Sequence, residues 1–275
     1  MLRYFALYLW GFIFWSVITY PNPCLGETIK FTPIPNQPRE VLVGNYYPLI
    51  EYLKKKTGLN IVFHYESSYQ KMLEDFKAEK IHIITTGPLP YVLLKREYPH
   101  AEAILHIKER DGSTFYRCVL FTSAQGPDSI KKLKGPIALP QRISTCGYFS
   151  ASIILSGEGK SLEKLGYTFF DNQYEIAEEV LKGTHEAGCL KEDIAMQYKG
   201  FAIKILKHSP PWPAFSIVVN RKILSPEVID KIKSALLNMS PEDTKKLNVG
   251  KYGFAQVKEK DFDIIKKYEK HIPKN

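Results

Sequence analysis

Two hydroxyl side chains and a glycine, Ser144, Thr145 and Gly147, lie in a polar loop that also contains Cys146. The loop follows an expected strand at residues 137–139 and precedes a helix that we expect to begin near Gly147. A helix N-terminus presents unpaired N–H groups and a partial positive charge, to which the hydroxyls add donors. Such a segment can bind a tetrahedral oxyanion, although Ser and Thr are also ordinary helix caps. Residues 144–147 are therefore our first candidate ligand-binding segment.

A second loop with similar chemistry, residues 85–91, follows an expected strand at residues 81–84. It contains the hydroxyls of Thr85 and Thr86, then Gly87, and then the aromatic Tyr91 beside an expected helix start. In open α/β sheets, ligands bind in the crevice beyond the carboxyl ends of the strands. We therefore expect the two loops to face each other across a cleft and to contact the same ligand.

Cys146 also supports a second interpretation, in which the protein is an enzyme. A cysteine at a helix N-terminus can have a lowered pKa and act as a nucleophile. It would need a nearby base, and none of the seven histidines lies in a recognisable cysteine-hydrolase context. The cysteine and histidine spacings fit no metal motif. We therefore predict a non-enzymatic protein with no catalytic residue, cofactor or metal, and keep the cysteine enzyme as the weaker alternative.

The cysteine count limits disulfide formation. Besides Cys24, the chain contains Cys118, Cys146 and Cys189, so at most one intramolecular disulfide can form among these three and one thiol is left over. A disulfide is permitted outside the cytoplasm. The sequence leaves the pairing open, including the absence of any disulfide.

The segments around these loops alternate between strands and helices, which predicts an α/β fold with mainly parallel sheets. Residues 47–57 form an expected helix, and Gly58 is a typical C-cap. Ser67 and Gln70 have the spacing of a capping box for the next helix. Residues 114–122 have the composition of one long strand.

Two strand-like runs, residues 115–121 and 215–219, bracket a central block of the chain. A block inserted between two such strands is how two lobes come to share a two-strand hinge, and hinged lobes bury a ligand on closure. We predict one lobe from residues 27–116 plus 214–275 and a second lobe from residues 117–213.

The N-terminal segment differs in composition from the rest of the chain. Arg3 is followed by an uncharged run to Tyr20, and Pro21 then precedes small residues before Glu27. This pattern predicts a secretory signal peptide at residues 1–26, with an uncleaved anchor as the alternative. The formal net charge is +9, but the lysines form no basic block, so we expect a field that attracts small anions and no nucleic-acid partner.

Several segments together resemble the phosphate, phosphite and phosphonate-binding proteins that serve ABC importers. The matching segments are residues 47–53 with Gly58, residues 68–69, 83–91 and 144–148, and residues 209–224. The resemblance implies a type II periplasmic-binding fold of two α/β lobes joined by a two-strand hinge. It also implies that residues 144–147 hold the phosphoryl group and that Tyr69 contacts the ligand.

Some positions depart from the family pattern. Cys146 replaces the third hydroxyl of the family loop, and a thiol is a poorer donor. Thr86 stands where family members that bind aminoalkylphosphonates have an aromatic residue, and Tyr174 where they have a histidine. Glu192 matches one acidic group that holds the ligand amine, whereas a second acid is missing at Phe215 or Ser216. Binding of an aminophosphonate is therefore in doubt.

The expected function is that of a monomeric, periplasmic or otherwise extracytoplasmic solute-binding protein. It would capture a small oxyanion of the phosphate, phosphite or phosphonate class and deliver it to the membrane subunits of an ABC importer. The ligand-binding lobe of a sensory system is the alternative. No sensor domain follows in the sequence, so signalling would need a separate protein.

Overall fold

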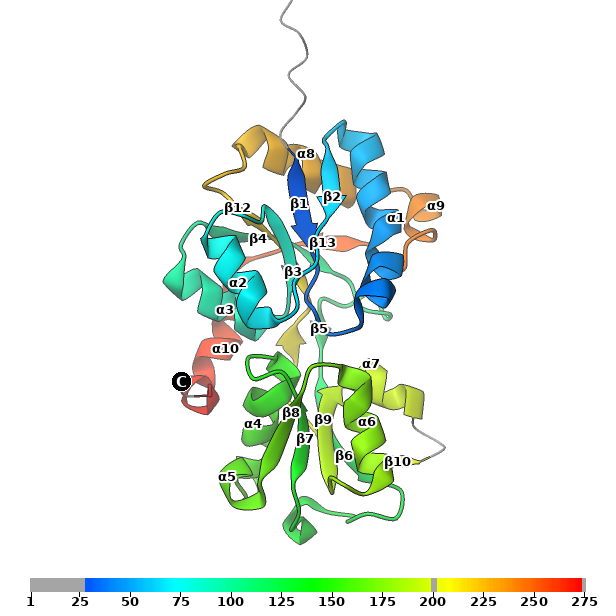
Figure 1. Ribbon diagram of the computed structural model, residues 1–275, viewed down its shortest axis with the longest axis vertical. Coiled ribbons are helices and arrows are strands. Elements are labelled where there is room, and N and C mark those ends of the chain that lie inside the picture. Colours follow the sequence, from blue (N-terminus) through cyan, green and yellow to red (C-terminus); the bar gives the residue numbers. More distant parts are fainter. Residues whose placement is uncertain (1–27, 199–201, 274–275) are drawn as a thin grey trace, which may run out of the picture.

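The computed structural model describes residues 28–198 and 202–273, which form two α/β halves (Figure 1). The strands are β1 (Ile29–Thr32), β2 (Ile61–Phe63), β3 (Ile83–Thr86), β4 (Ala101–Ile107), β5 (Phe115–Tyr116), β6 (Cys118–Ser123), β7 (Ile137–Pro140), β8 (Tyr167–Phe170), β9 (Ala187–Lys191), β10 (Ile203–His208), β11 (Trp212–Pro213), β12 (Ser216–Asn220) and β13 (Phe254–Gln256). The α-helices are α1 (Arg39–Thr57), α2 (Tyr69–Lys77), α3 (Pro88–Glu97), α4 (Ser150–Ser156), α5 (Leu162–Leu165), α6 (Gln173–Lys182), α7 (Glu192–Ala195), α8 (Pro226–Leu237), α9 (Pro241–Thr244) and α10 (Asp263–Lys267).

Each half is built on its own sheet. The six-stranded sheet has the order β13-β4-β12-β3-β1-β2, and the five-stranded sheet has the order β10-β6-β9-β7-β8. A separate two-stranded ribbon, β11 with β5, connects the halves, and Figure 1 shows β5 between them. We call the two parts the six-stranded half and the five-stranded half.

Both large sheets are mixed, so the prediction of mainly parallel sheets is wrong. In the six-stranded sheet β1 is parallel to β2 and β3, whereas β12 is antiparallel to β3 and β4. The reason is the path of the chain. β3 ends at the side of the sheet that faces the other half, whereas β12 enters from that side after the chain has returned through β11. The returning strand β12 therefore runs antiparallel to β3.

The local signals in the sequence are mostly confirmed. The expected apolar face of α1 is buried, and Gly58 ends the helix in the left-handed conformation, with φ of 70°. The cap that the sequence predicts for α2, Ser67, is one residue too early. Ser68, and not Ser67, caps this helix by accepting a hydrogen bond from the backbone N–H of Lys71.

The expected strand at residues 114–122 is divided at Arg117. Before this residue, β5 pairs with β11, and Tyr116 lies opposite Trp212. After it, β6 joins the five-stranded sheet between β10 and β9. Trp212 is fully buried, and one continuous hydrophobic cluster around it includes Phe76 of the six-stranded half and Leu155 of the five-stranded half. The apolar core therefore continues from one half to the other through the connecting ribbon.

The C-terminal segment contacts both halves. Arg96 of α3 forms an ion pair with Glu269 at 2.6 Å between Nη1 and Oε1. Ser152 of α4 is hydrogen-bonded to His271, with 2.9 Å between Oγ and Nδ1. Figure 1 shows α10 beside the junction of the two halves. The lobe boundaries given above, including the assignment of residues 214–275 to the first lobe, stay predictions.

Across residues 28–198 and 202–273, no helix has the length and apolar character needed to cross a membrane. The predicted signal peptide at residues 1–26 lies outside the described part of the chain.

The close packing of β9 gives a test of the five-stranded half. An added Cβ at Gly188 would lie 2.7 Å from Cζ of Phe121 and 3.0 Å from Cγ2 of Ile176. Both neighbours are fully buried. We expect Gly188→Ala to lower the free energy of unfolding by about 1–3 kcal/mol, as overpacked cores do, in urea denaturation.

The matched control is Gly44→Ala in α1, where an added Cβ meets no atom within 4 Å. We expect this variant to be as stable as the parent or more stable by up to about 1 kcal/mol, because alanine favours the helix. Equal stability of the Gly188 variant and the parent would contradict the described packing.

Candidate functional site

A cavity of about 730 Å³ lies where the two halves meet, and both contribute to its walls. Tyr69 and Gly87 line it from the six-stranded half, and Ser144, Thr145 and Cys146 line it from the five-stranded half. β3 and β7 both end at this cavity, as expected for a ligand crevice beyond the carboxyl ends of strands. The structure thus brings part of each predicted loop to one cavity.

The loop after β7 is less regular than expected. Residues Thr145–Phe149 form a wide π-type turn in which Gly147 has non-helical backbone angles, φ −86° and ψ −132°. The regular helix α4 begins only at Ser150, three residues after the expected start. Glycine is favoured at position 147 because an added Cβ would lie only 3.1 Å from the Pro140 carbonyl oxygen. Gly147 shapes the loop but is not among the residues that line the cavity.

The hydroxyls of this loop form hydrogen bonds across the cavity wall. Ser144 is hydrogen-bonded to the Tyr69 hydroxyl, and Thr145 to the Tyr116 hydroxyl. Thr145 Oγ1 also accepts a hydrogen bond of 3.1 Å from the Leu89 backbone N–H. Burial raises the pKa of both tyrosines, with an opposing effect from these hydrogen bonds. Both phenols therefore stay protonated at neutral pH and can donate to a bound anion.

Cys146 forms a disulfide with Cys118, the first residue of β6. This pairing settles the question that the sequence left open, and Cys189 remains as a buried free thiol. Burial raises the pKa of Cys189, so this thiol is neutral at physiological pH. Cys146 has no thiolate in this state, which removes the basis of the cysteine-enzyme alternative.

The other residues of the second loop have structural partners. The Thr85 and Tyr46 hydroxyls are hydrogen-bonded at 2.9 Å, and Thr86 is fully buried. The Tyr91 hydroxyl accepts a hydrogen bond from the Ala103 backbone N–H. Of the four loop residues predicted to contact a ligand, only Gly87 lines the cavity.

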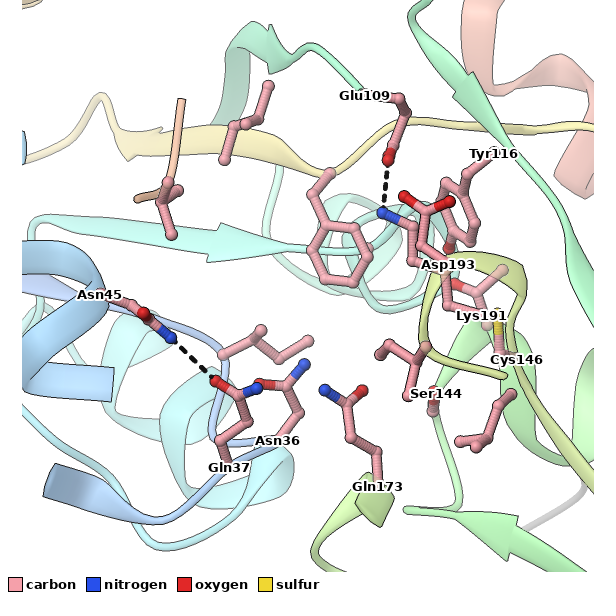
Figure 2. Close-up of a pocket in the computed structure, with 18 of the residues that line it drawn as sticks. Asn36, Gln37, Asn45, Glu109, Tyr116, Ser144, Cys146, Gln173, Lys191 and Asp193 are labelled. Atoms are coloured by element: carbon pink, nitrogen blue, oxygen red, sulfur yellow. Dashed lines mark hydrogen bonds and ion pairs between the residues drawn. The ribbon is translucent and has the colours of Figure 1, made fainter. Parts of the chain in front are cut away.

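Amide side chains connect the halves beside the cavity. Gln141 of the five-stranded half donates to the Pro35 carbonyl oxygen at 3.1 Å and accepts from the Tyr69 N–H at 3.0 Å. The Tyr174 hydroxyl, predicted to contact the ligand, accepts instead from Gln37 at 2.9 Å. Figure 2 shows Asn36, Gln37 and Gln173 close together at this wall. The described arrangement therefore has the halves in direct contact.

Sequence reasoning missed the charged pair in the cavity. Lys191 Nζ lies 2.5 Å from Glu109 Oε2, and both side chains line the cavity (Figure 2). Burial raises the pKa of Glu109, and Lys191 opposes this change. One signal was present in the sequence, since Lys191 comes directly after a short run of uncharged residues at positions 187–190. The predicted contact Glu192 also lines the cavity, where its carboxylate is 3.0 Å from His208 Nε2.

The cavity therefore presents hydroxyls and amides, which are groups suited to binding an anion by hydrogen bonds. Its charged lining residues are the cations Lys108, Arg110, Lys191 and Lys251 and the carboxylates Glu109, Asp171, Glu192 and Asp193. In the described part of the chain, no group of three or more His, Cys, Asp or Glu side chains has the arrangement of a metal site.

Comparison with known proteins gives a consistent result. Residues 31–262 match the family of periplasmic substrate-binding proteins of phosphonate ABC transporters. Among solved structures, PhnD1 of Prochlorococcus marinus in complex with methylphosphonate is similar, with a TM-score of 0.77 and 16% identity over 88% of this chain and 97% of that chain. A binding protein component of an ABC phosphonate transporter from Pseudomonas aeruginosa has a TM-score of 0.77 and 15% identity over 89% and 86% of the two chains. A Xanthomonas citri protein bound to ATP has a TM-score of 0.71 and 16% identity over 89% and 96%. The predicted type II periplasmic-binding fold is confirmed.

The disulfide gives a test of how the loop is held. Replacing both Cys118 and Cys146 by Ser should lower the free energy of unfolding by about 3.5 kcal/mol, the chain-entropy value for this loop length, in urea denaturation. Peptide mapping after alkylation of the denatured, unreduced parent should find Cys189 modified and the other two protected. Alkylation of Cys146 without a reductant would contradict the pairing.

Proposed function

Because the chain belongs to the family of periplasmic substrate-binding proteins of phosphonate ABC transporters, we propose that it captures a small phosphorus oxyanion between its two halves and delivers it to an ABC importer. The family consists of substrate-binding proteins, so the protein is non-enzymatic. We further propose that it acts as a periplasmic monomer, exported by the predicted signal peptide at residues 1–26.

The observation that carries this proposal is the position of the loop after β7. Ser144, Thr145 and Cys146 line the cavity from one side, and the phenols of Tyr69 and Tyr116 reach the same loop. Protonated hydroxyls and backbone N–H groups are the donors that an oxyanion needs, and hydrogen bonds to a charged group are stronger than neutral ones.

Contact between the halves supports a closed, ligand-holding arrangement. The Gln141 and Gln37 hydrogen bonds join segments on opposite sides of the cavity. In our proposal the halves separate about the β5–β11 ribbon to admit the ligand and then close over it. Closure would exclude water, and low local polarity strengthens the hydrogen bonds to the anion.

The proposal is tested by thermal unfolding of purified protein that has been freed of bound solute by partial unfolding and refolding. We expect phosphate, phosphite or an alkylphosphonate to raise the melting temperature by roughly 5–10 °C at one hundred times its dissociation constant. Sulfate and acetate at equal concentration are the controls. A rise in melting temperature with only sulfate or acetate would overturn the phosphorus-oxyanion assignment. The absence of a rise with every anion tested would overturn it as well.

The Ser144→Ala substitution tests whether the anion binds at the proposed loop. Loss of a hydroxyl that donates to the charged ligand should weaken binding by about 1.5–3 kcal/mol in isothermal titration calorimetry. Ser144 is a better choice than Thr145, because replacing Thr145 would also remove the acceptor of the Leu89 backbone N–H. Ser156→Ala, at the exposed far end of α4, is the matched control and should bind like the parent. Unchanged affinity in the Ser144 variant would remove this hydroxyl from the site.

A further inference from the structure

The ammonium of Lys191 lies beside two neighbouring aromatic rings in the wall of the cavity. Its Nζ is 5.0 Å from the ring centroid of Tyr116 and 5.6 Å from that of Phe215. The carboxylate of Glu109 completes the group, at 2.5 Å from the same atom. Two ring faces and a carboxylate form a typical site for an ammonium ion. We call these three partners, Tyr116, Phe215 and Glu109, the cation cage.

The cation cage shares a wall with the candidate oxyanion loop. The Tyr116 hydroxyl is hydrogen-bonded to Thr145, while the ring of the same tyrosine contacts Lys191. All of these residues line the one cavity. A ligand whose oxyanion reaches residues 144–146 therefore places its remaining substituent near the cage.

The cage is already neutralised by the protein. The side chains of Lys191 and Glu109 are only 21% and 12% exposed, so both charges depend on each other for compensation. Asp193 lies beside this pair in Figure 2 and acts on Glu109 electrostatically. A ligand ammonium would have to displace Lys191 or approach it against like-charge repulsion. A ligand without a cation meets neither cost.

We propose that Lys191 is a specificity-determining residue, whose ammonium fills the cation cage so that the site selects phosphorus oxyanions that carry no amine. This inference rests on the proposed function and deepens it, since it states which class of substituent the ligand carries. Lys191 acts by occupying the position of a ligand cation and by repelling one.

The parent protein gives the first test. The two probes are n-propylphosphonate and 2-aminoethylphosphonate, which are alike in size and differ by a methyl group in place of the ammonium. We expect calorimetry to find the amine-free probe bound at least about tenfold more tightly, because like charges repel inside the cavity. Equal binding, or tighter binding of the amine, would overturn the inference. Failure of both probes and of phosphate to bind would overturn the proposed function as well.

Lys191→Met gives the second test, because it keeps an apolar stem beside the two rings and removes the charge. The buried Glu109 carboxylate then lacks its partner. The affinity for 2-aminoethylphosphonate relative to that for n-propylphosphonate should therefore rise by about tenfold or more. The double variant Lys191→Met/Glu109→Gln should lose this gain. The control is Lys207→Met, which breaks an exposed ion pair to Glu158 of the same length, 2.5 Å, and should leave the ratio unchanged. An unchanged affinity ratio in Lys191→Met would overturn the inference. If this variant does not fold, the comparison of the two probes in the parent protein is the deciding test.

Discussion

The β5–β11 ribbon joins the two sheets, and it supports both the candidate loop at residues 144–147 and the helix that follows it. The Tyr116 hydroxyl is bonded to Thr145 within the loop. The indole N–H of Trp212 donates to Ser150 Oγ at 2.9 Å, where α4 begins. Because Trp212 is fully buried, moving the ribbon would disturb both the core and the loop. The segment about which the halves are proposed to move is therefore also the support of the candidate site.

Local chemistry explains what the sequence could predict. The glycine that ends α1 is found where expected, because such a C-cap depends only on neighbouring residues. The loop at residues 144–147 was recognisable because a buried strand, two hydroxyls and a glycine follow one another within a short segment. Because this loop follows the carboxyl end of β7, it lies where ligands generally bind in α/β sheets.

The remaining features depend on contacts between distant residues. Lys191 and Glu109 are 82 positions apart, and nothing near either residue identifies its partner. Tyr91 and Tyr174 have the types expected of ligand contacts, but their hydroxyls are taken by Ala103 and Gln37. The antiparallel pairing of β12 arises from the return of the chain to the six-stranded sheet through the ribbon. Such pairings follow from the packing of the halves, and a single sequence does not reveal them.

The Cys118–Cys146 bond also links the binding loop to the place where the protein matures. Cysteines remain reduced in most cytoplasms and are oxidised after export. A chain still in the cytoplasm would therefore have two thiols here, with its binding loop not yet tied to β6. The loop would acquire its covalent connection only where oxidants act on newly translocated chains. Under the proposed export of this chain, assembly of the ligand-facing surface is thus coupled to delivery of the polypeptide, and a precursor retained inside the cell would lack this constraint.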